Sequence, residues 1–244
     1  MRTFGLVGHP LGHSFSQRYF TEKFANMGLS DECQYLNFDL ESIDCLGRVL
    51  DEHPTLEGFN VTIPYKEQII PLLDSLSEGA QRIGAVNCVR VQGGRLVGHN
   101  TDVFGAGLTI DHLTCKQPCR ALVLGSGGAS KAVREALRMR NIPYHLVSRT
   151  GQGEVLSYAD LTEEVMREHR LIINTTPLGM YPRVDAAPEI PYRLLTPNHM
   201  LFDLIYNPAE TLFMRRGTEQ GARTASGGEM LIEQAEKSWE IWNI

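Results

Sequence analysis

The sequence lacks the long apolar run of a membrane span, because no stretch approaches the roughly 20 residues that a spanning helix needs. Its N-terminus has no signal-peptide pattern. Basic residues are fewer than acidic ones, 23 against 29, and they form no cluster, which argues against nucleic acid as the main partner. We therefore expect a cytoplasmic protein that binds neither a membrane nor nucleic acid.

Cysteine is also scarce. The five cysteines are Cys33, Cys45, Cys88, Cys115 and Cys119. An odd and scattered set is typical of reduced thiols in a reducing compartment. Cys115 and Cys119 have no second pair of Cys or His at zinc-binding spacing, and His9 and His13 flank a turn rather than share a helical face. We expect no metal site.

The most informative stretch lies between residues 120 and 149. An apolar run, 121–124, ends in Gly125-Ser126-Gly127-Gly128, a helical stripe begins at Ala129, and a second strand covers 144–147. Glycines let the backbone approach a pyrophosphate, and the helix N-terminus offers N–H groups and partial positive charge. Ser130 stands where a third glycine is common. The pattern predicts a nucleotide site, and the alternative is a glycine-rich turn of a doubly wound sheet without a ligand.

The length of 244 residues, with 42% hydrophobic and 21% charged, suits two globular domains. In the first part we expect strands at 3–7, 34–40 and 58–66, a new helix after Pro64, and a hairpin over 84–100. A helix over 103–113 would lead into the second part, where helices and strands alternate up to 226. A last helix from Gly228 carries both tryptophans and needs a buried face. We place the domain boundary near residue 104.

Polar residues at strand ends are the candidates for chemistry. Lys66 follows the strand that runs into proline, and Asp102 follows the hairpin; a lysine beside an aspartate can transfer a proton. The alternatives are a solvated lysine and a helix cap. Ser14 and Ser16 are either caps or hydroxyl donors to a substrate carboxylate. Gln234 falls in the apolar stripe of the last helix and needs a partner.

Taken together, these motifs resemble the shikimate dehydrogenase family, and they span nearly the whole chain in the order that the family has. They are the loop 8–16, Asn60-Val61-Thr62-Ile63-Pro64-Tyr65-Lys66, Gly84-Ala85-Val86-Asn87, Gly98-His99-Asn100-Thr101-Asp102, the glycine turn 125–129, Asn174-Thr175-Thr176-Pro177-Leu178-Gly179-Met180, 203–208 and 227–234. The resemblance implies an α/β fold with a substrate-binding catalytic domain over 1–104 and a Rossmann-like doubly wound NADP-binding domain over 105–227. The C-terminal helix, 228–244, would return to the first domain.

The resemblance also implies an activity, the reversible reduction of 3-dehydroshikimate to shikimate with NADPH in aromatic amino acid biosynthesis. Lys66 and Asp102 would be the catalytic pair. The residues implied to bind the small-molecule substrate are Ser14, Ser16, Thr62, Asn87, Tyr206 and Gln234. Those implied to contact the cofactor are Gly125, Ser126, Gly127, Gly128, Ala129, Ser148, Arg149, Thr150, Leu204 and Gly227. A monomer and a homodimer both stay open.

The sequence departs from the family pattern in four ways. Gln17 stands where proline is usual, and the His-Asn pair expected soon after it is absent. Cys88 replaces the usual threonine, and Val103 replaces the usual glycine. None of these changes removes a proposed catalytic group. They leave open a paralogue that acts on quinate, and a noncatalytic nucleotide-sensing protein on the same fold is a further alternative.

The choice of cofactor depends on the end of the second strand of the glycine-turn unit. An acid about 20 residues past the glycines favours NAD, but here the strand ends in Ser148-Arg149-Thr150 with no acid before Glu154. A guanidinium can pair with the 2′-phosphate of NADP, although a surface arginine is the alternative. Glu154 has the wrong sign for a phosphate site. We expect a moderate preference for NADPH.

Overall fold

The computed structural model describes residues 1–12 and 15–244. It contains two compact units, Met1–Thr101 with Ala235–Ile244, and Asp102–Gln234. The sequence predicted division at 104 and assigned the whole last helix to the first domain, whereas the observed division falls at Thr101 and inside that helix. The reason is packing, because the start of the helix α8 (Gly227–Trp242) lies against α4 (Asp102–Thr114), where Gly105 contacts the main chain of Met230.

The first unit is built on a six-stranded mixed sheet with the order β2-β1-β3-β5-β6-β4. The strands are β1 (Arg2–Gly8), β2 (Cys33–Asp39), β3 (Leu56–Val61), β4 (Ser75–Leu76), β5 (Cys88–Gln92) and β6 (Arg95–His99). β1 runs parallel to β2 and β3, whereas β5 runs antiparallel to both β3 and β6. The end of β3, the start of β5 and the end of β6 therefore meet at one edge of the sheet.

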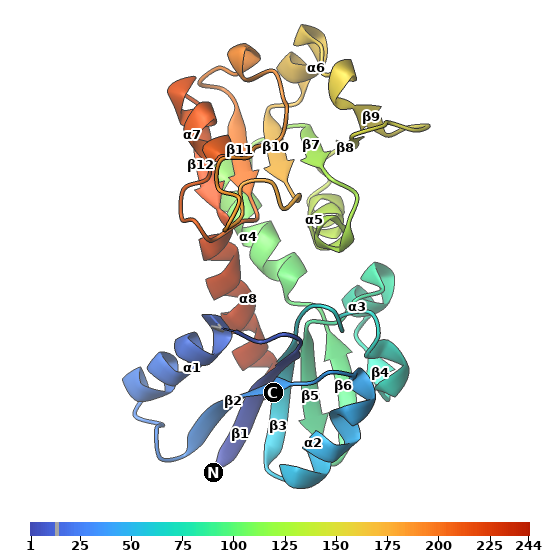
Figure 1. The fold of residues 1–244 in the computed structure, drawn as a ribbon, viewed down its shortest axis with the longest axis vertical. Helices are drawn as coiled ribbons and strands as arrows, with labels where there is room; N and C mark the ends of the chain where they lie inside the picture. Colours follow the sequence, from blue (N-terminus) through green and yellow to red (C-terminus); the bar gives the residue numbers. More distant parts are fainter. Residues whose placement is uncertain (13–14) are drawn as a thin grey trace. The chain divides into compact units, whose positions relative to one another are not determined.

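Helices cover both faces of this sheet (Figure 1). On one face lie α1 (Phe15–Asn26) and the end of α8, and their apolar side chains form a cluster with Phe4, Tyr35 and Cys88. On the other face, α2 (Leu46–Glu52) and α3 (Glu78–Ile83) pack on a second cluster around Phe59 and Val61. Because helices cover both faces of the sheet, β1 and β3 are buried along almost their whole length.

Trp242 joins α8 to the sheet. Its indole is 4% exposed, stacks on Phe4 with ring centroids 5.0 Å apart, and donates from Nε1 to the carbonyl of Val89 at 3.0 Å. Ala235 of the same helix is fully buried. The apolar face that the sequence indicated for the last helix is thus buried in the first unit from Ala235 onward.

A polar cluster also fastens α8 to α1. Glu236 accepts two hydrogen bonds from Lys23 Nζ, at 2.7 and 2.8 Å, and one from the Tyr19 hydroxyl. Burial acts to raise the pKa of Glu236, but the hydrogen bonds from Lys23 and Tyr19 and the charge of Lys23 outweigh it and lower the pKa. Charged Glu236 is therefore the form that the folded state favours.

We expect Glu236→Gln to destabilise the protein at neutral pH. We also expect the free energy of unfolding of this variant to fall less steeply as the pH is lowered. A lowered folded pKa contributes stability above the unfolded value of 4.5 that disappears as pH falls through the folded pKa. Because the Glu236 side chain is 38% exposed, the loss at pH 7 should be only about 0.5–1 kcal/mol. Urea unfolding of both proteins at pH 7 and pH 3.5 measures this, and a difference that stays equal at the two pH values would contradict it.

The second unit contains a parallel sheet with the order β12-β11-β10-β7-β8-β9. The strands are β7 (Ala121–Leu124), β8 (Tyr144–Ser148), β9 (Leu156–Ser157), β10 (Leu171–Asn174), β11 (Met200–Asp203) and β12 (Arg223–Ser226). The chain starts at the centre, builds outward through β9, and then returns to build outward through β12, which is the doubly wound nucleotide-binding order. The predicted α/β class is confirmed.

Helices also cover both faces of the second sheet. α6 (Glu163–Glu168) and α7 (Leu212–Glu219) pack on one face, where Met166 and Phe213 join a cluster with Leu122 and Leu124. α4 and α5 (Gly128–Met139) pack together on the other face. Among the described residues, no helix is both long and apolar enough to cross a membrane.

One local prediction is wrong. No α-helix starts after Pro64, because residues 64–69 form turns that lead into a short 3₁₀ helix, η2 (Ile70–Leu72). Pro71 in this segment has no N–H to donate and would break an α-helix. The short strands β4 and β9, of two residues each, were not expected, since so few residues show no periodicity. Three further 3₁₀ helices are η1 (Ile43–Cys45), η3 (Tyr158–Asp160) and η4 (Tyr192–Leu194).

Candidate active site

Main-chain hydrogen bonds bring Thr62 and Asn87 to the same edge of the first sheet. Thr62 N donates to Val7 O at 2.9 Å, just beyond the end of β3. Asn87 O accepts from Val61 N at 2.9 Å, and Asn87 N donates to His99 O at 3.1 Å. The antiparallel placement of β5 thus puts two predicted substrate residues side by side, although 25 positions separate them in the sequence.

Lys66 is held at the same edge. Its carbonyl accepts from Val86 N at 2.7 Å, next to Asn87, and the preceding turn closes with Tyr65 N donating to Thr62 O at 2.9 Å. The buried Tyr65 ring anchors this turn, because its hydroxyl donates to Leu40 O. The half-buried Lys66 therefore shares the edge with Thr62 and Asn87.

The Asn87 side chain is fixed at both ends. Its Nδ2 donates to Thr101 Oγ1 at 3.0 Å, and its Oδ1 accepts from Thr101 N at 2.6 Å. Both residues are almost completely buried, with Asn87 3% and Thr101 1% exposed. Asn87 thus has a defined orientation before any ligand arrives, which is what a substrate-positioning amide requires.

The other predicted catalytic and substrate residues lie as follows. Ser14 lies outside the described residues. Ser16 is in the first turn of α1, hydrogen-bonded to Tyr35. Asp102 directly follows Thr101 and is the first residue of α4, where helix N–H groups favour a negative charge. Tyr206, after β11, is half exposed, and buried Gln234 donates from Nε2 to Leu231 O at 2.9 Å.

Predicted cofactor residues gather at one edge of the second sheet. Val147, Leu124, Asn174, Asp203 and Ser226 are neighbours across the sheet, each the last or next-to-last residue of its strand. The residues that follow them include Ser148, Gly125, Leu204 and Gly227. Ligands of doubly wound sheets bind at this carboxyl edge, so the four residues lie where a dinucleotide is held.

Two glycines at this edge meet specific geometric demands. Gly125 has a φ of +102°, in the region that side chains rarely adopt, and this turns the chain sharply out of β7. A β-carbon on Gly227 would lie 2.0 Å from the carbonyl oxygen of Leu204. At both positions the path of the main chain by itself requires glycine, whether or not a ligand is bound.

The turn before α5 fits a phosphate group. Among the described residues, no side chain caps the N-terminus of α5, and no atom lies within 4 Å of a β-carbon built on Gly127 or Gly128. The N–H of Ser130 already donates to Gly127 O at 3.0 Å, so the N–H groups of Gly128 and Ala129 at the start of α5 are the ones placed to meet an anion. Ser130, at the third glycine position, is fully buried and donates from Oγ to Gly127 O at 2.8 Å, so the departure from glycine supports the turn.

Beyond β8, Ser148 Oγ accepts from Gly151 N at 3.2 Å and shapes the next turn. Arg149, Thr150 and Glu154 are exposed. Ser126 and Ala129 are also exposed in the glycine turn. Within residues 1–12 and 15–244, no group of three or more His, Cys, Asp and Glu side chains could hold a metal ion.

Asp203 is a supporting residue that sequence reasoning did not single out. It is fully buried and accepts from Thr211 Oγ1 at 2.6 Å, Asn174 Nδ2 at 3.0 Å and Ile205 N at 3.1 Å. Burial raises its pKa, and these three hydrogen bonds act in the opposite direction. Its signals in the sequence were its place at the start of the motif 203–208, at the end of an apolar run, and eight residues before a threonine helix cap. Asp203 ties the loops after β10 and β11 together.

The order of the second sheet, the uncapped helix at its carboxyl edge and the accompanying mixed-sheet unit define a class, the two-unit α/β proteins with a Rossmann-type dinucleotide fold. The family model described as the shikimate dehydrogenase substrate binding domain matches residues 6–89. The shikimate dehydrogenase (NADP(+)) of Methanosphaera stadtmanae is 35% identical over 98% of this chain and 90% of its own length. The chain therefore belongs to the shikimate dehydrogenase family, and the resemblance seen in the sequence is confirmed.

Solved structures agree with this assignment. The shikimate 5-dehydrogenase of Thermus thermophilus, in complex with NADP(H) and shikimate, is 33% identical with a TM-score of 0.85, and the match covers 99% of this chain and 93% of that one. The quinate dehydrogenase of Corynebacterium glutamicum, in complex with NAD, is 27% identical with a TM-score of 0.86 over 99% of this chain and 93% of that one.

Proposed function

We propose that this protein catalyses the reversible reduction of 3-dehydroshikimate to shikimate with NADPH, a step of the shikimate pathway of aromatic amino acid biosynthesis. Its membership of the shikimate dehydrogenase family supports the reaction. The observation that carries it is the placement of Lys66, Thr62 and Asn87 at one edge of the first sheet. A lysine and a threonine on the same sheet edge as a fixed amide supply the groups that a small polyhydroxylated ketone needs.

The proton transfer is assigned to Lys66. NADPH, when bound, supplies the hydride that reduces the carbonyl carbon. Lys66 donates a proton to the carbonyl oxygen as negative charge develops there, so the alcohol forms without a free alkoxide. Asp102 holds the ammonium group in position and stabilises its charge. In the reverse direction, Lys66 takes the hydroxyl proton back.

Substrate recognition is divided between two kinds of group. Ser14, Ser16 and Gln234 are proposed to hold the substrate carboxylate. Thr62, Asn87 and Tyr206 are proposed to hold its hydroxyls. Six polar partners discriminate strongly against analogues that lack a matching group, because an unmatched buried polar group is costly.

The cofactor is assigned to the carboxyl edge of the second sheet. The residues proposed to contact it are Gly125, Ser126, Gly127, Gly128, Ala129, Ser148, Arg149, Thr150, Leu204 and Gly227. The glycine turn and the N-terminus of α5 would bind the pyrophosphate. Arg149 would pair with the 2′-phosphate. A cytoplasmic location and a monomeric or homodimeric state complete the proposal.

Arg149→Ala should raise the KM for NADPH and leave that for NADH almost unchanged, because NADH has no 2′-phosphate for the guanidinium to pair with. The preference of the unmutated protein for NADPH should be about 1–3 kcal/mol, the scale of a charge-assisted hydrogen bond. Steady-state kinetics with both cofactors measure the two values.

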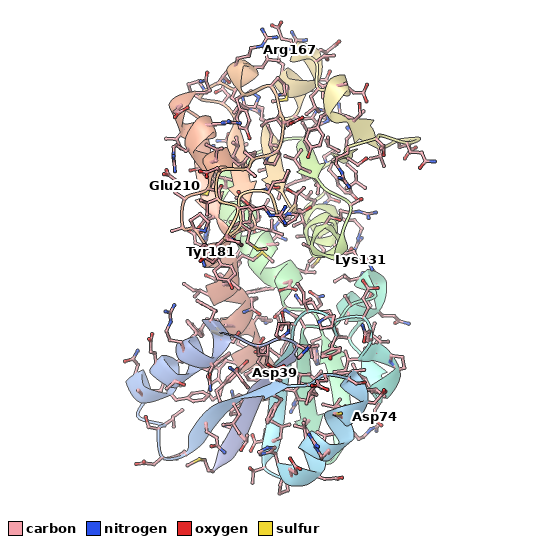
Figure 2. All side chains as sticks on the ribbon, in the orientation of Figure 1. Asp39, Asp74, Lys131, Arg167, Tyr181 and Glu210 are labelled. Carbon is pink, nitrogen blue, oxygen red and sulfur yellow. The ribbon has the colours of Figure 1, made fainter. Side chains whose placement is uncertain are left out.

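Arg167→Ala is the matched control for Arg149→Ala. Arg167 is also exposed, and Figure 2 shows it on α6, at the opposite end of this unit from Lys131 in the first turn of α5. This control should leave both KM values unchanged. Equal kcat/KM for NADPH and NADH in the unmutated protein would refute the role of Arg149.

The proposed function is tested by mixing the protein with shikimate and NADP and following the absorbance of the reduced cofactor. The same assay with quinate and NAD tests the second candidate, which the likeness to a quinate dehydrogenase structure favours. Turnover of quinate in preference to shikimate would replace the proposal by that candidate. Cofactor binding without turnover of either compound would instead identify a noncatalytic nucleotide-binding protein.

A further inference from the structure

A buried hydroxyl lies between α8 and the first sheet, in a layer that is otherwise mostly apolar. Ser238 is fully buried, and its Oγ accepts from Asn60 Nδ2 at 2.8 Å. The same Oγ lies 3.3 Å from Thr101 Oγ1. Ser238 is thus a polar link from the last helix to two separate points of the edge that carries the candidate active site.

Both partners of Ser238 hold Asn87. Asn60 donates from Nδ2 to Asn87 O at 3.1 Å, and Thr101 holds the Asn87 side-chain amide at both ends. Asn60 is itself fixed from the other side, because Tyr35 donates its hydroxyl hydrogen to Asn60 Oδ1 at 2.9 Å. Ser238 therefore reaches the main chain of Asn87 through one partner and its side chain through the other.

One placement of the hydrogen atoms satisfies all of these contacts, although either hydroxyl of the Ser238–Thr101 pair can be the donor. Asn60 donates to Ser238, so the Ser238 hydroxyl hydrogen is available for Thr101 Oγ1. Thr101 can then donate its own hydrogen to Asn87 Oδ1, which lies 3.2 Å away. A buried chain of this kind strengthens each of its hydrogen bonds, and an unfilled place in it is costly. Without Ser238 Oγ, the Thr101 hydroxyl would lose this contact and could rotate its hydrogen away from Asn87 Oδ1.

Cys88 shows why this serine matters in this chain. The position after Asn87 holds threonine in the family pattern, but here it holds a fully buried thiol in hydrogen-bonding contact with Ser238 and Trp242. Burial raises the pKa of Cys88 to about 12, so the thiol stays neutral and is only a weak donor or acceptor. Of the neighbours Cys88 and Ser238, it is therefore Ser238 that supplies a strong hydrogen-bonding group.

We propose that Ser238 is a positioning residue for the reaction, whose hydroxyl fixes Asn87 for substrate, the main chain through Asn60 and the side chain through Thr101. This role rests on the proposed function. Ser238 supplies this hydroxyl from the last helix, next to Cys88, where the family pattern has threonine. Ser238 does not contact the substrate itself.

Ser238→Ala should raise the KM for shikimate about three- to tenfold, the range that corresponds to the loss of one buried hydrogen bond. The KM for NADP should not change, because the network lies entirely within the first unit. Adding Cys88→Thr to Ser238→Ala returns a hydroxyl to the layer from the strand, and we expect it to restore much of the shikimate KM. Ser238→Cys keeps the approximate shape with a weaker hydrogen-bonding group and should give an intermediate KM.

Ile241→Val is the matched structural control. Ile241 lies on the same helix, is 8% exposed, and loses one buried methyl group without losing a polar contact. It should lower the thermal midpoint but leave the KM for shikimate unchanged. If Ser238→Ala fails to fold, Ser238→Cys and the double variant carry the comparison.

The outcomes separate the two proposals. Wild-type protein without activity on shikimate overturns the proposed function and this role with it. Active wild-type protein with an unchanged KM in folded Ser238→Ala overturns this role alone. An equal rise in KM for Ile241→Val also overturns it. That result would show that any loosening of α8 raises the KM for shikimate, with no specific need for the Ser238 hydroxyl.

Discussion

Lys66→Ala is expected to lower kcat by about 10²–10⁴ with a smaller effect on the KM for shikimate, the range for loss of a positioned general acid and base. The main chain at Lys66 is held by Val86, and the buried Tyr65 anchors the turn, so removing the side chain should leave the edge of the sheet in place. In the oxidation of shikimate, water would then have to accept the hydroxyl proton as the hydride leaves, and in the reverse reduction water would have to donate it. Single-turnover and steady-state kinetics with shikimate and NADP measure the effect.

Lys116→Ala controls for the loss of a positive charge. Lys116 is exposed and lies after the end of α4, outside the predicted site. Its kcat should match that of the unmutated protein. Lys66→Ala should also bind NADP normally, because the cofactor residues belong to the second unit. The rise in thermal midpoint on addition of NADP measures this binding. A Lys66→Ala protein with near-normal kcat would exclude Lys66 as the proton-transfer residue.

Trp242→Ala is expected to destabilise the protein by about 3–5 kcal/mol, the usual cost of truncating a large buried aromatic side chain. The indole is 4% exposed and lies within 5.3 Å of Phe20 and 5.0 Å of Phe4 between ring centroids. Its loss also leaves the carbonyl of Val89 without the indole N–H. Because these contacts hold the end of α8 on the first sheet, activity should fall with the stability of that unit.

Urea or thermal unfolding followed by circular dichroism measures the change, with Ile244→Ala as the control. Ile244 is two positions further along and 80% exposed, so its truncation should change the unfolding free energy by less than about 0.5 kcal/mol. A Trp242→Ala protein as stable as Ile244→Ala would show that α8 is not needed to cover the first sheet.

Some features of the fold follow from local sequence. The glycine turn after β7 was predictable because a tight turn into a helix N-terminus needs glycine at Gly125, where φ is +102°. The alternation of strands and helices in the second unit was predictable because apolar runs and helical stripes differ in period. Asn87 was recognised as a strand-end residue for the same reason, whereas β3 ends at Val61, five residues before Lys66. Motif resemblance added the roles now proposed for both residues.

Local patterns failed where short segments or prolines were involved. The helix expected after Pro64 is a run of turns and a 3₁₀ helix, because Pro71 interrupts the hydrogen bonding of an α-helix. The division of α8 between two units was not visible either, since its apolar stripe continues without a break. Periodicity reports which face of a helix is buried and not which part of the chain buries it.

The sequence by itself determined the class of fold, the family and the residue types available for chemistry, because these depend on composition, period and motif. Only the tertiary structure decided which of those residues meet. Ser238 and Asn60 are 178 positions apart, and Asn87 lies beside Thr62 because β5 pairs antiparallel with β3. Strand order and helix docking are set by the burial of apolar surface over the whole unit, and a local pattern carries no information about the partner of each surface. The buried network around Asn87 is therefore a property of the folded chain alone.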